Sequence, residues 1–206
     1  MIPRYDLSGE IMPGASAEIG LFCADNAGPV QIYINSFGGL ATEGAAIHAA
    51  LEQHGQVTAI IQGVAASAAS LAMLGAKRVL IHAAALVMIH NPSGMAVGEA
   101  QDLRSAADTL DKLAVLYASI YARSTGNPVA RISAWMRDET WMTADEAVAL
   151  NFADAVVGGD NSQPIAVAAF DYTRFTAAPS HLVTMARQNG WATVSPDTGT
   201  KEKTDA

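Results

Sequence analysis

Cysteine and aromatic residues are scarce in this 206-residue sequence. The single cysteine, Cys23, cannot form a disulfide within the chain, and no cysteine–histidine spacing matches a zinc site. Aromatic residues make up only 6% of the chain, whereas alanine and glycine are abundant, which favours a layered α/β fold with closely packed elements. We therefore expect no metal or other cofactor, and a lone cysteine is consistent with a reducing compartment.

Positive charge is also sparse. Lysine and arginine together number 12 against 20 acidic residues, so the formal net charge is -8. The lysines do not cluster; they are Lys77, Lys112, Lys201 and Lys203. A nucleic-acid binder needs a basic stripe that displaces counterions from phosphates. The sequence therefore predicts no nucleic-acid partner.

Long hydrophobic segments are missing as well. Residues 1–10 carry Arg4, Asp6 and Glu10 without an apolar stretch, so we expect no signal peptide. Val57–Ala76 lacks charge, but it is mostly alanine, serine and glycine and includes Gln62, a composition that inserts poorly into a bilayer. We therefore expect no membrane contact and a cytoplasmic location.

The first ninety residues alternate short apolar strands with helices. Half of the chain is apolar and only 16% is charged, so a sizeable core is expected. The expected strands are Val30–Ser36, Val57–Gln62, Arg78–Ile81 and Leu86–His90. The expected helices between them are Thr42–His54, closed by Gly55, and Ala66–Leu74. This alternation predicts an α/β fold with parallel strands joined by right-handed crossovers.

The second half is predicted to be mainly helical. Gly98–Arg123 has apolar residues at steps of three and four, which indicates a long amphipathic helix. A shorter helix is expected at Val129–Arg137, then a helix that begins with a Thr143/Glu146 capping box and a strand at Phe152–Val157. From Ala178 onward polar residues dominate. We therefore expect one domain, residues 1–177, and a flexible polar tail, residues 178–206.

Ser67 lies at a predicted strand-to-helix turn among very small residues, Gly63-Val64-Ala65-Ala66-Ser67-Ala68. At such a turn, a hydroxyl can be held at a helix N-terminus, where amides and the helix dipole favour negative charge. This is the logic of a nucleophile elbow. The alternative is a simple N-cap of a core helix, and Ser67 taken alone favours that alternative.

Two further elements could complete a site. His90 ends an apolar strand, where a neutral imidazole can take a hydroxyl proton and return it to a leaving amine; a structural histidine is the alternative. The Gly38-Gly39 pair predicts a tight turn whose amide N–H groups could form an oxyanion hole. Asp138 and Glu139 supply carboxylates that could orient a histidine or simply end a solvated helix.

Taken together, these segments resemble one family. The resemblance lies in four blocks: Asn35-Ser36-Phe37-Gly38-Gly39, Gly63-Val64-Ala65-Ala66-Ser67, Met88-Ile89-His90-Asn91-Pro92 and Trp141-Met142-Thr143-Ala144-Asp145-Glu146-Ala147. In this order they resemble the signature blocks of the Clp protease proteolytic subunit over about residues 30–157. The resemblance implies a crotonase-like (ClpP-like) spiral of stacked βα units and a Ser-His-acid triad.

The resemblance also implies roles for individual residues. Ser67 corresponds to the nucleophile, His90 to the base, and the backbone N–H groups of Gly39 and Ala68 to the oxyanion hole. A gap-free count places the third triad member on Glu139, with Asp138 as the alternative. The helix at residues 98–123 corresponds to the handle by which subunits of this family interlock into homo-oligomeric rings.

The sequence departs from the Clp pattern at two places, and the second favours a particular branch. Phe37 replaces the proline usual in the first block, and the 29 residues before Val30 do not resemble the hairpin that engages an unfoldase. Phage head-maturation (prohead) proteases of the Clp-like class are similar in the short segment before the first block and in the Glu139-Thr140-Trp141 block. The resemblance then implies a serine endopeptidase that cuts scaffold and capsid proteins without an ATPase, in the bacterial host cytoplasm.

Four alternatives remain open. The chain could be an ATP-dependent Clp proteolytic subunit, or a ring-forming scaffold of the same fold that has lost its chemistry. A Ser-Lys dyad of the signal peptide peptidase kind is disfavoured because neither Lys77 nor Lys112 lies in a matching block. A crotonase-type acyl-CoA enzyme is disfavoured because it needs no nucleophilic serine.

Overall fold

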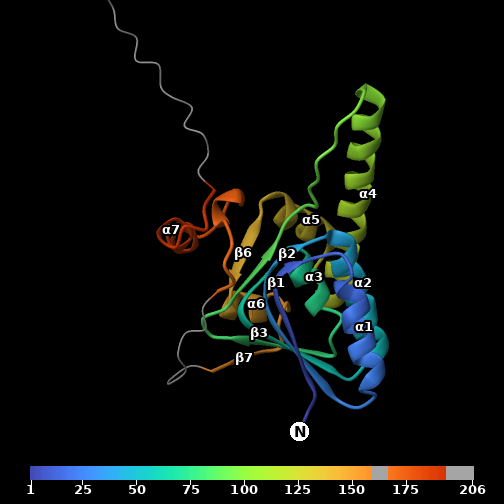
Figure 1. The fold of residues 1–206 in the computed structure, drawn as a ribbon, viewed down its shortest axis with the longest axis vertical. Coiled ribbons are helices and arrows are strands. Elements are labelled where there is room, and N and C mark those ends of the chain that lie inside the picture. Colours follow the sequence, from blue (N-terminus) through green and yellow to red (C-terminus); the bar gives the residue numbers. More distant parts are fainter. Residues whose placement is uncertain (159–166, 194–206) are drawn as a thin grey trace, which may run out of the picture. The chain divides into compact units, whose positions relative to one another are not determined.

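The computed structural model describes residues 1–158 and 167–193 (Figure 1). The chain divides into two compact units, residues 1–168 and residues from Ala169 onward. The first unit contains a seven-stranded sheet and six helices, α1 to α6. In the part of the chain that is described, no helix combines the length and apolar character needed to cross a membrane.

The sheet is parallel except for one strand. Its strands are β1 (Arg4–Ile11), β2 (Val30–Gly39), β3 (Val57–Ala66), β4 (Arg78–His82), β5 (Leu86–Ile89), β6 (Thr140–Thr143) and β7 (Ala155–Val157). The main order is β1-β2-β3-β4-β7. The middle of β3 pairs with β4, whereas its end pairs with β5, and β6 pairs antiparallel with β5. This branching brings β5 and β6 to the C-terminal end of β3.

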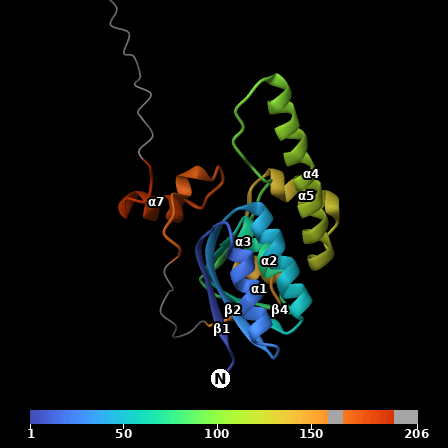
Figure 2. The same cartoon turned by 45° about the vertical axis from the view of Figure 1, so that its right-hand side comes forward.

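Helices cover the sheet and connect its strands. They are α1 (Ala15–Asp25), α2 (Ala41–His54), α3 (Ala68–Met73), α4 (Ala100–Thr125), α5 (Val129–Arg137) and α6 (Ala144–Ala149). Helices α1 and α2 lie side by side in both views (Figures 1 and 2). The buried residues of α4 lie only in its last third, and its first part extends away from the sheet (Figure 2).

Most predicted elements are present at nearly the predicted residues. The α5 helix matches the predicted bounds, α2 ends at a left-handed Gly55 as expected, and the capping box of α6 forms between Thr143 and Glu146. The long helix α4 is shifted by two residues and ends at a left-handed Gly126. β3 continues to Ala66, which was predicted to begin the next helix, and β7 is only three residues long.

Three features differ from the prediction. Residues 4–11 and 15–25 form β1 and α1, which were not predicted, and residues 140–143 form β6. The Gly38-Gly39 pair is not a turn but the end of β2. It stays in the sheet because β1 pairs with it, Glu10 opposite Gly38 and Ile11 opposite Gly39, after a shift in the register between the two strands.

Part of the predicted flexible polar tail, residues 178–206, forms regular secondary structure in the second unit. This unit contains a short 3₁₀ helix, η1 (Tyr172–Arg174), and α7 (Ser180–Gln188). Leu182 and Ala186 of α7 are buried, and this apolar face explains why the segment is ordered. The rings of Phe170, Tyr172 and Phe175 lie against one another. The rest of the predicted tail, residues 194–206, lies outside the described residues.

Asp171 links η1 to the segment that follows α7. Burial alone would raise the pKa of its carboxyl, but hydrogen bonds donated by Thr173 and Thr193 outweigh burial and lower this pKa to about 2. The backbone N–H of Thr193 donates to Asp171 at 2.8 Å. A charged carboxylate therefore anchors Thr193, which lies beyond the end of α7.

Candidate active site

Ser67 occupies a sharp turn between β3 and α3. Its φ of 55° and ψ of −125° are a strained combination that residues with a Cβ rarely adopt. Its N–H donates to the carbonyl of Met88 at 2.9 Å, and its own carbonyl accepts the N–H of Ser70 at 3.0 Å. These bonds hold the turn on both sides and leave the hydroxyl half-buried.

His90 follows the end of β5, which runs parallel to β3. The two strands pair through Ala66 and Met88, so the residues after each strand meet at the same edge of the sheet. The Nε2 atom of His90 lies 2.7 Å from the Oγ atom of Ser67. The next residue, Asn91, donates its N–H to the carbonyl of Met136 at 3.0 Å, which fixes the histidine segment against α5.

Glu139 reaches the same edge through β6. Because β5 and β6 are antiparallel with Ile89 opposite Thr140, the next position in this register places Glu139 beside His90. Glu139 has a left-handed backbone with φ 52°, is half-buried, and accepts a hydrogen bond from Nε1–H of Trp141 at 3.4 Å. Asp138, the alternative carboxylate, is exposed at the end of α5.

The pKa of His90 responds to both its burial and its neighbour. Burial disfavours the imidazolium and lowers the pKa of His90 below its ordinary value, while the negative charge of Glu139 acts in the opposite direction. Burial has the larger effect, so the net shift is downward. At neutral pH the imidazole is therefore uncharged, the form that can accept a proton.

The two glycines of β2 pack closely around the Ser67 turn and β1. A Cβ atom on Gly38 would lie 2.6 Å from the Cβ of Ser67 and 3.0 Å from the backbone nitrogen of Ala68. The N–H of Gly38 donates to Oγ of Ser36 at 3.1 Å, and that hydroxyl donates to the carbonyl of Gly9 at 2.6 Å. The amides predicted for the oxyanion hole, those of Gly39 and Ala68, thus belong to segments that meet beside Ser67.

A small hollow of about 20 Å³ adjoins Ser67 and His90. Its other lining residues are Ala41, Ala68, Leu71, Tyr117 and Tyr121. The hydroxyl of Tyr121 lies 2.8 Å from Oγ of Ser70, which donates to the carbonyl of Ser67 at 2.7 Å. The sequence pattern does not distinguish the two tyrosines as site residues, because their spacing indicates only the buried face of α4.

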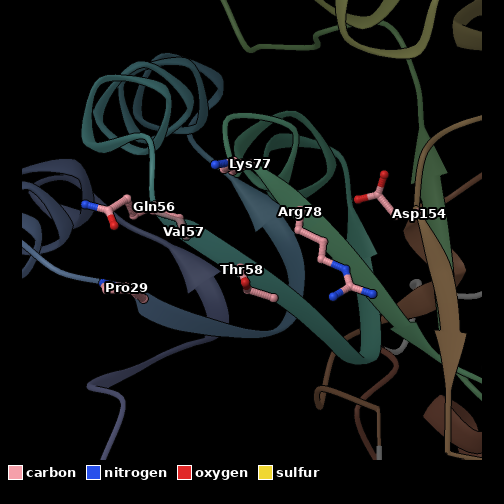
Figure 3. Close-up of a pocket in the computed structure, with 7 residues that line it drawn as sticks. All are labelled: Pro29, Gln56, Val57, Thr58, Lys77, Arg78 and Asp154. Carbon is pink, nitrogen blue, oxygen red and sulfur yellow. The ribbon is translucent and has the colours of Figure 1, made fainter.

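A much larger cavity, of about 440 Å³, lies at the opposite ends of the strands (Figure 3). It is lined by residues at the N-terminal ends of β2, β3, β4 and β7, namely Pro29, Gln56, Val57, Thr58, Lys77, Arg78 and Asp154. Figure 3 shows these side chains spread along the strand starts rather than converging on one point. Ser67 and His90 instead follow the C-terminal ends of their strands, where parallel sheets place their sites.

Within the described ranges, 1–158 and 167–193, no group of three or more histidine, cysteine, aspartate or glutamate side chains is arranged to hold a metal ion.

Comparison with known proteins places this arrangement in a family. A model described as Clp protease matches residues 16–160. The ATP-dependent Clp protease proteolytic subunit 2 of Bacillus licheniformis is 33% identical over 140 residues, which are 66% of this chain and 74% of that protein. A solved structure of a ClpP1 mutant from Listeria monocytogenes shares the fold, with a TM-score of 0.68 and 21% identity over 76% of this chain and 91% of its own. The chain belongs to the Clp protease family, a family of serine peptidases, and has its α/β fold.

Proposed function

We propose that the protein is a serine endopeptidase in which Ser67 is the nucleophile and His90 is the general base. The observation that carries the proposal is the 2.7 Å separation of Oγ and Nε2 at the end of two adjacent parallel strands. Oγ attacks the scissile carbonyl carbon as Nε2 takes the hydroxyl proton, and Nε2 then gives that proton to the departing amine. Water, activated in the same way, releases the acyl group from Ser67.

Glu139 is the third member of the triad in this proposal. Its carboxylate carries the charge that favours the imidazolium formed during proton transfer. The half-buried position of Glu139 and the exposure of Asp138 support this choice over the neighbouring aspartate. Glutamate can play the same orienting role as aspartate with a longer side chain. The left-handed backbone of Glu139, with φ 52°, lets the chain turn from α5 into β6 beside His90.

The backbone N–H groups of Gly39 and Ala68 form the oxyanion hole in this mechanism. Ala68 is the first residue of α3, so its N–H has no partner within the helix. A Cβ atom on Gly38 would lie 3.0 Å from the backbone nitrogen of Ala68, so the end of β2 packs directly against the Ser67 turn. This close packing supports an oxyanion hole that takes one amide from each segment. Two amides directed at the developing oxyanion stabilise the tetrahedral intermediate.

Labelling with a fluorophosphonate tests this proposal directly. The full chain should become covalently labelled at Ser67, and both Ser67→Ala and His90→Ala should abolish labelling. Matched controls are Ser119→Ala, an exposed serine on α4, and His181→Ala, an exposed histidine on α7; both should label as the wild type does. Absence of labelling in the assembled protein would instead favour a catalytically inactive scaffold of the same fold.

The biological role that we propose is phage head maturation, with scaffold and capsid polypeptides as substrates in the bacterial host cytoplasm and no ATPase. The Glu139-Thr140-Trp141 block supports this role over that of a housekeeping Clp subunit. Residues 4–11 also form a strand of the main sheet rather than the hairpin by which Clp subunits engage an unfoldase. Purified protein should process an assembled scaffold or capsid protein without ATP. Degradation of a folded substrate only when an unfoldase and ATP are added would favour the second candidate, an ATP-dependent Clp subunit, which is how its Bacillus relative is named.

We also propose that α4 joins subunits into a homo-oligomeric ring. Leu103, Val115 and Leu116 are exposed on this helix, an arrangement that leaves apolar surface for a second copy. Light scattering should give a mass several times that of the 21.4 kDa chain. Replacing Leu116 with glutamate should lower that mass, whereas Ser119→Ala on the same helix should not.

A further inference from the structure

The hydroxyl of Tyr117 is a buried polar group without a hydrogen-bond partner. It is the only such side-chain nitrogen or oxygen among the described residues, and the side chain is just 5% exposed. Buried polar groups are nearly always satisfied, because an unpaired one loses its bonds to water without replacement. A phenylalanine would fill the same space at no such cost, so the hydroxyl does not stabilise the free protein.

Tyr117 lies in the hollow beside the candidate nucleophile. It lines that hollow together with Ser67, His90, Leu71 and Ala41. Burial raises the pKa of Tyr117, so the hydroxyl keeps its proton and offers a donor as well as an acceptor at neutral pH. Besides Tyr117 and Tyr121, the residues that line the hollow with Ser67 and His90 are the apolar Ala41, Ala68 and Leu71.

Tyr121 provides a contrast one helical turn later. It lines the same hollow, but its hydroxyl is already paired, at 2.8 Å from Ser70 Oγ and 3.5 Å from the carbonyl of Ser67. Tyr121 therefore supports the Ser67 turn, whereas Tyr117 is left for a group that the free protein does not contain.

The hollow is small. Its volume of about 20 Å³ is roughly what a single water molecule needs, so it admits one or two heavy atoms but not a leucine or phenylalanine side chain. A charged side chain is also excluded, because its charge would be buried against Leu71 and Ala41 without a counter-ion.

We propose that this hollow receives the side chain of the residue whose carbonyl Ser67 attacks (the P1 residue), and that Tyr117 selects a small hydroxyl-bearing P1 residue, serine above all. This inference rests on the proposed peptidase function. A serine at P1 pairs with the Tyr117 hydroxyl when the substrate closes the hollow. An apolar P1 side chain of the same size leaves that hydroxyl unpaired, and a site built around a hydrogen bond rejects such an analogue.

Three peptides that differ only at P1 test the inference. They carry serine, its apolar isostere 2-aminobutyrate, or leucine, and each is cleaved by the full-length wild type, Tyr117→Phe and Tyr121→Phe. For the wild type we expect kcat/KM to be about three- to tenfold higher for serine than for 2-aminobutyrate, the effect of one neutral hydrogen bond. Leucine should be cleaved most slowly. In Tyr117→Phe the ratio of serine to 2-aminobutyrate should fall to about one.

Tyr121→Phe is the matched control, with the same atoms removed from the same helix one turn away. It should slow the serine and 2-aminobutyrate peptides alike and leave their ratio unchanged, because its hydroxyl supports Ser67 rather than the substrate. Tyr117→Phe should also melt at the wild-type temperature or above it, since it removes no hydrogen bond from the free protein.

Fluorophosphonate labelling separates failure of this inference from failure of the proposed function. A chain that is not labelled at Ser67 and cleaves no peptide contradicts the function itself. A labelled chain overturns the P1 assignment alone if its serine preference survives Tyr117→Phe, if leucine is preferred, or if it cleaves none of the three peptides.

Discussion

The Nε2 atom of His90 and the Oγ atom of Ser67 lie 2.7 Å apart, although neither residue belongs to a strand or a helix. Each directly follows one of two neighbouring parallel strands, and the pairing of Ala66 with Met88 sets their relative height. The N–H of Ser67 also donates to the carbonyl of Met88, so a backbone hydrogen bond fixes the spacing between the two side chains. The geometry of the pair is therefore a property of the sheet and does not depend on a mobile loop.

The first prediction concerns pH. Proton transfer from Ser67 needs neutral His90, so activity is present above the pKa of His90 and is lost as pH falls through it. Burial lowers this pKa below its ordinary value of 6.5, and Glu139 opposes the shift without cancelling it. The acidic limb of kcat/KM for peptide hydrolysis should therefore have its midpoint below pH 6.5. In Glu139→Gln the opposing charge is gone, so the limb should move to still lower pH; a move upward would contradict this electrostatic account.

The second prediction separates the two adjacent carboxylates. Glu139→Gln should lower kcat by roughly 100- to 10,000-fold, by analogy with loss of the acid from a serine protease triad. Asp138→Asn removes the same charge from the neighbouring exposed position and should change kcat by less than about twofold. Steady-state kinetics on one peptide measures both. The reverse ranking would assign the orienting role to Asp138.

Local patterns in the sequence accounted for most of the helices and for the parallel strands. The step of three and four in α4, the glycine after α2 and the Thr143/Glu146 capping box are all local signals, and each has its expected counterpart in the structure. The positions of Ser67 and His90 at the ends of strands could be predicted for the same reason. Their 2.7 Å contact could not be derived from those patterns and was implied only by resemblance to a family.

The features that were missed depend on non-local pairing. β1 carries Arg4, Asp6 and Glu10 on a partly exposed strand, so it lacks the apolar run that marks a buried strand. Its pairing with Gly38 and Gly39 is what keeps these glycines in the sheet, and no local rule shows it. Tyr117 and Tyr121 likewise lie one turn apart on the buried face of α4, yet of these two only Tyr121 has a hydrogen-bond partner for its hydroxyl. Periodicity identifies a buried face but not the hydrogen bonds on it.

The third prediction concerns the close packing of Gly38. Gly38 has φ +100°, and an added Cβ would lie 2.6 Å from the Cβ of Ser67 and 2.7 Å from the carbonyl oxygen of Ala66. Gly38→Ala should lower the free energy of unfolding by about 1–3 kcal/mol and slow fluorophosphonate labelling of Ser67 at least about tenfold. Urea unfolding and labelling time courses measure the two effects.

Gly20→Ala is the control for this substitution. Gly20 lies within α1, and a Cβ there would meet no atom within 4 Å. Alanine favours a helix over glycine by up to about 1 kcal/mol, so this variant should be as stable as the wild type or more stable and should label at the same rate. Normal labelling of Gly38→Ala would show that the Ser67 turn tolerates a displaced β2.

The fourth prediction concerns the link between α4 and the Ser67 turn. Ser70 Oγ donates to the Ser67 carbonyl at 2.7 Å and lies 2.8 Å from the buried hydroxyl of Tyr121. Ser70→Ala removes the nearer partner of that hydroxyl and should lower the free energy of unfolding by about 1–3 kcal/mol. Tyr121→Phe removes the other side of the same contact and should cost a comparable amount.

The double variant Ser70→Ala/Tyr121→Phe decides whether the two hydroxyls act as a unit. With both hydroxyls removed, no buried group is left unpaired at this contact, so the loss should be smaller than the sum of the single losses by about 1 kcal/mol. Urea unfolding of the four proteins measures this coupling. Strictly additive losses would mean that the hydroxyls stabilise the fold independently. Ser70 acts through the backbone of Ser67 and touches neither His90 nor Glu139 in this scheme. Loss of its hydroxyl should therefore slow fluorophosphonate labelling without moving the pH midpoint of the labelling rate. A shifted midpoint would place Ser70 in the proton-transfer path.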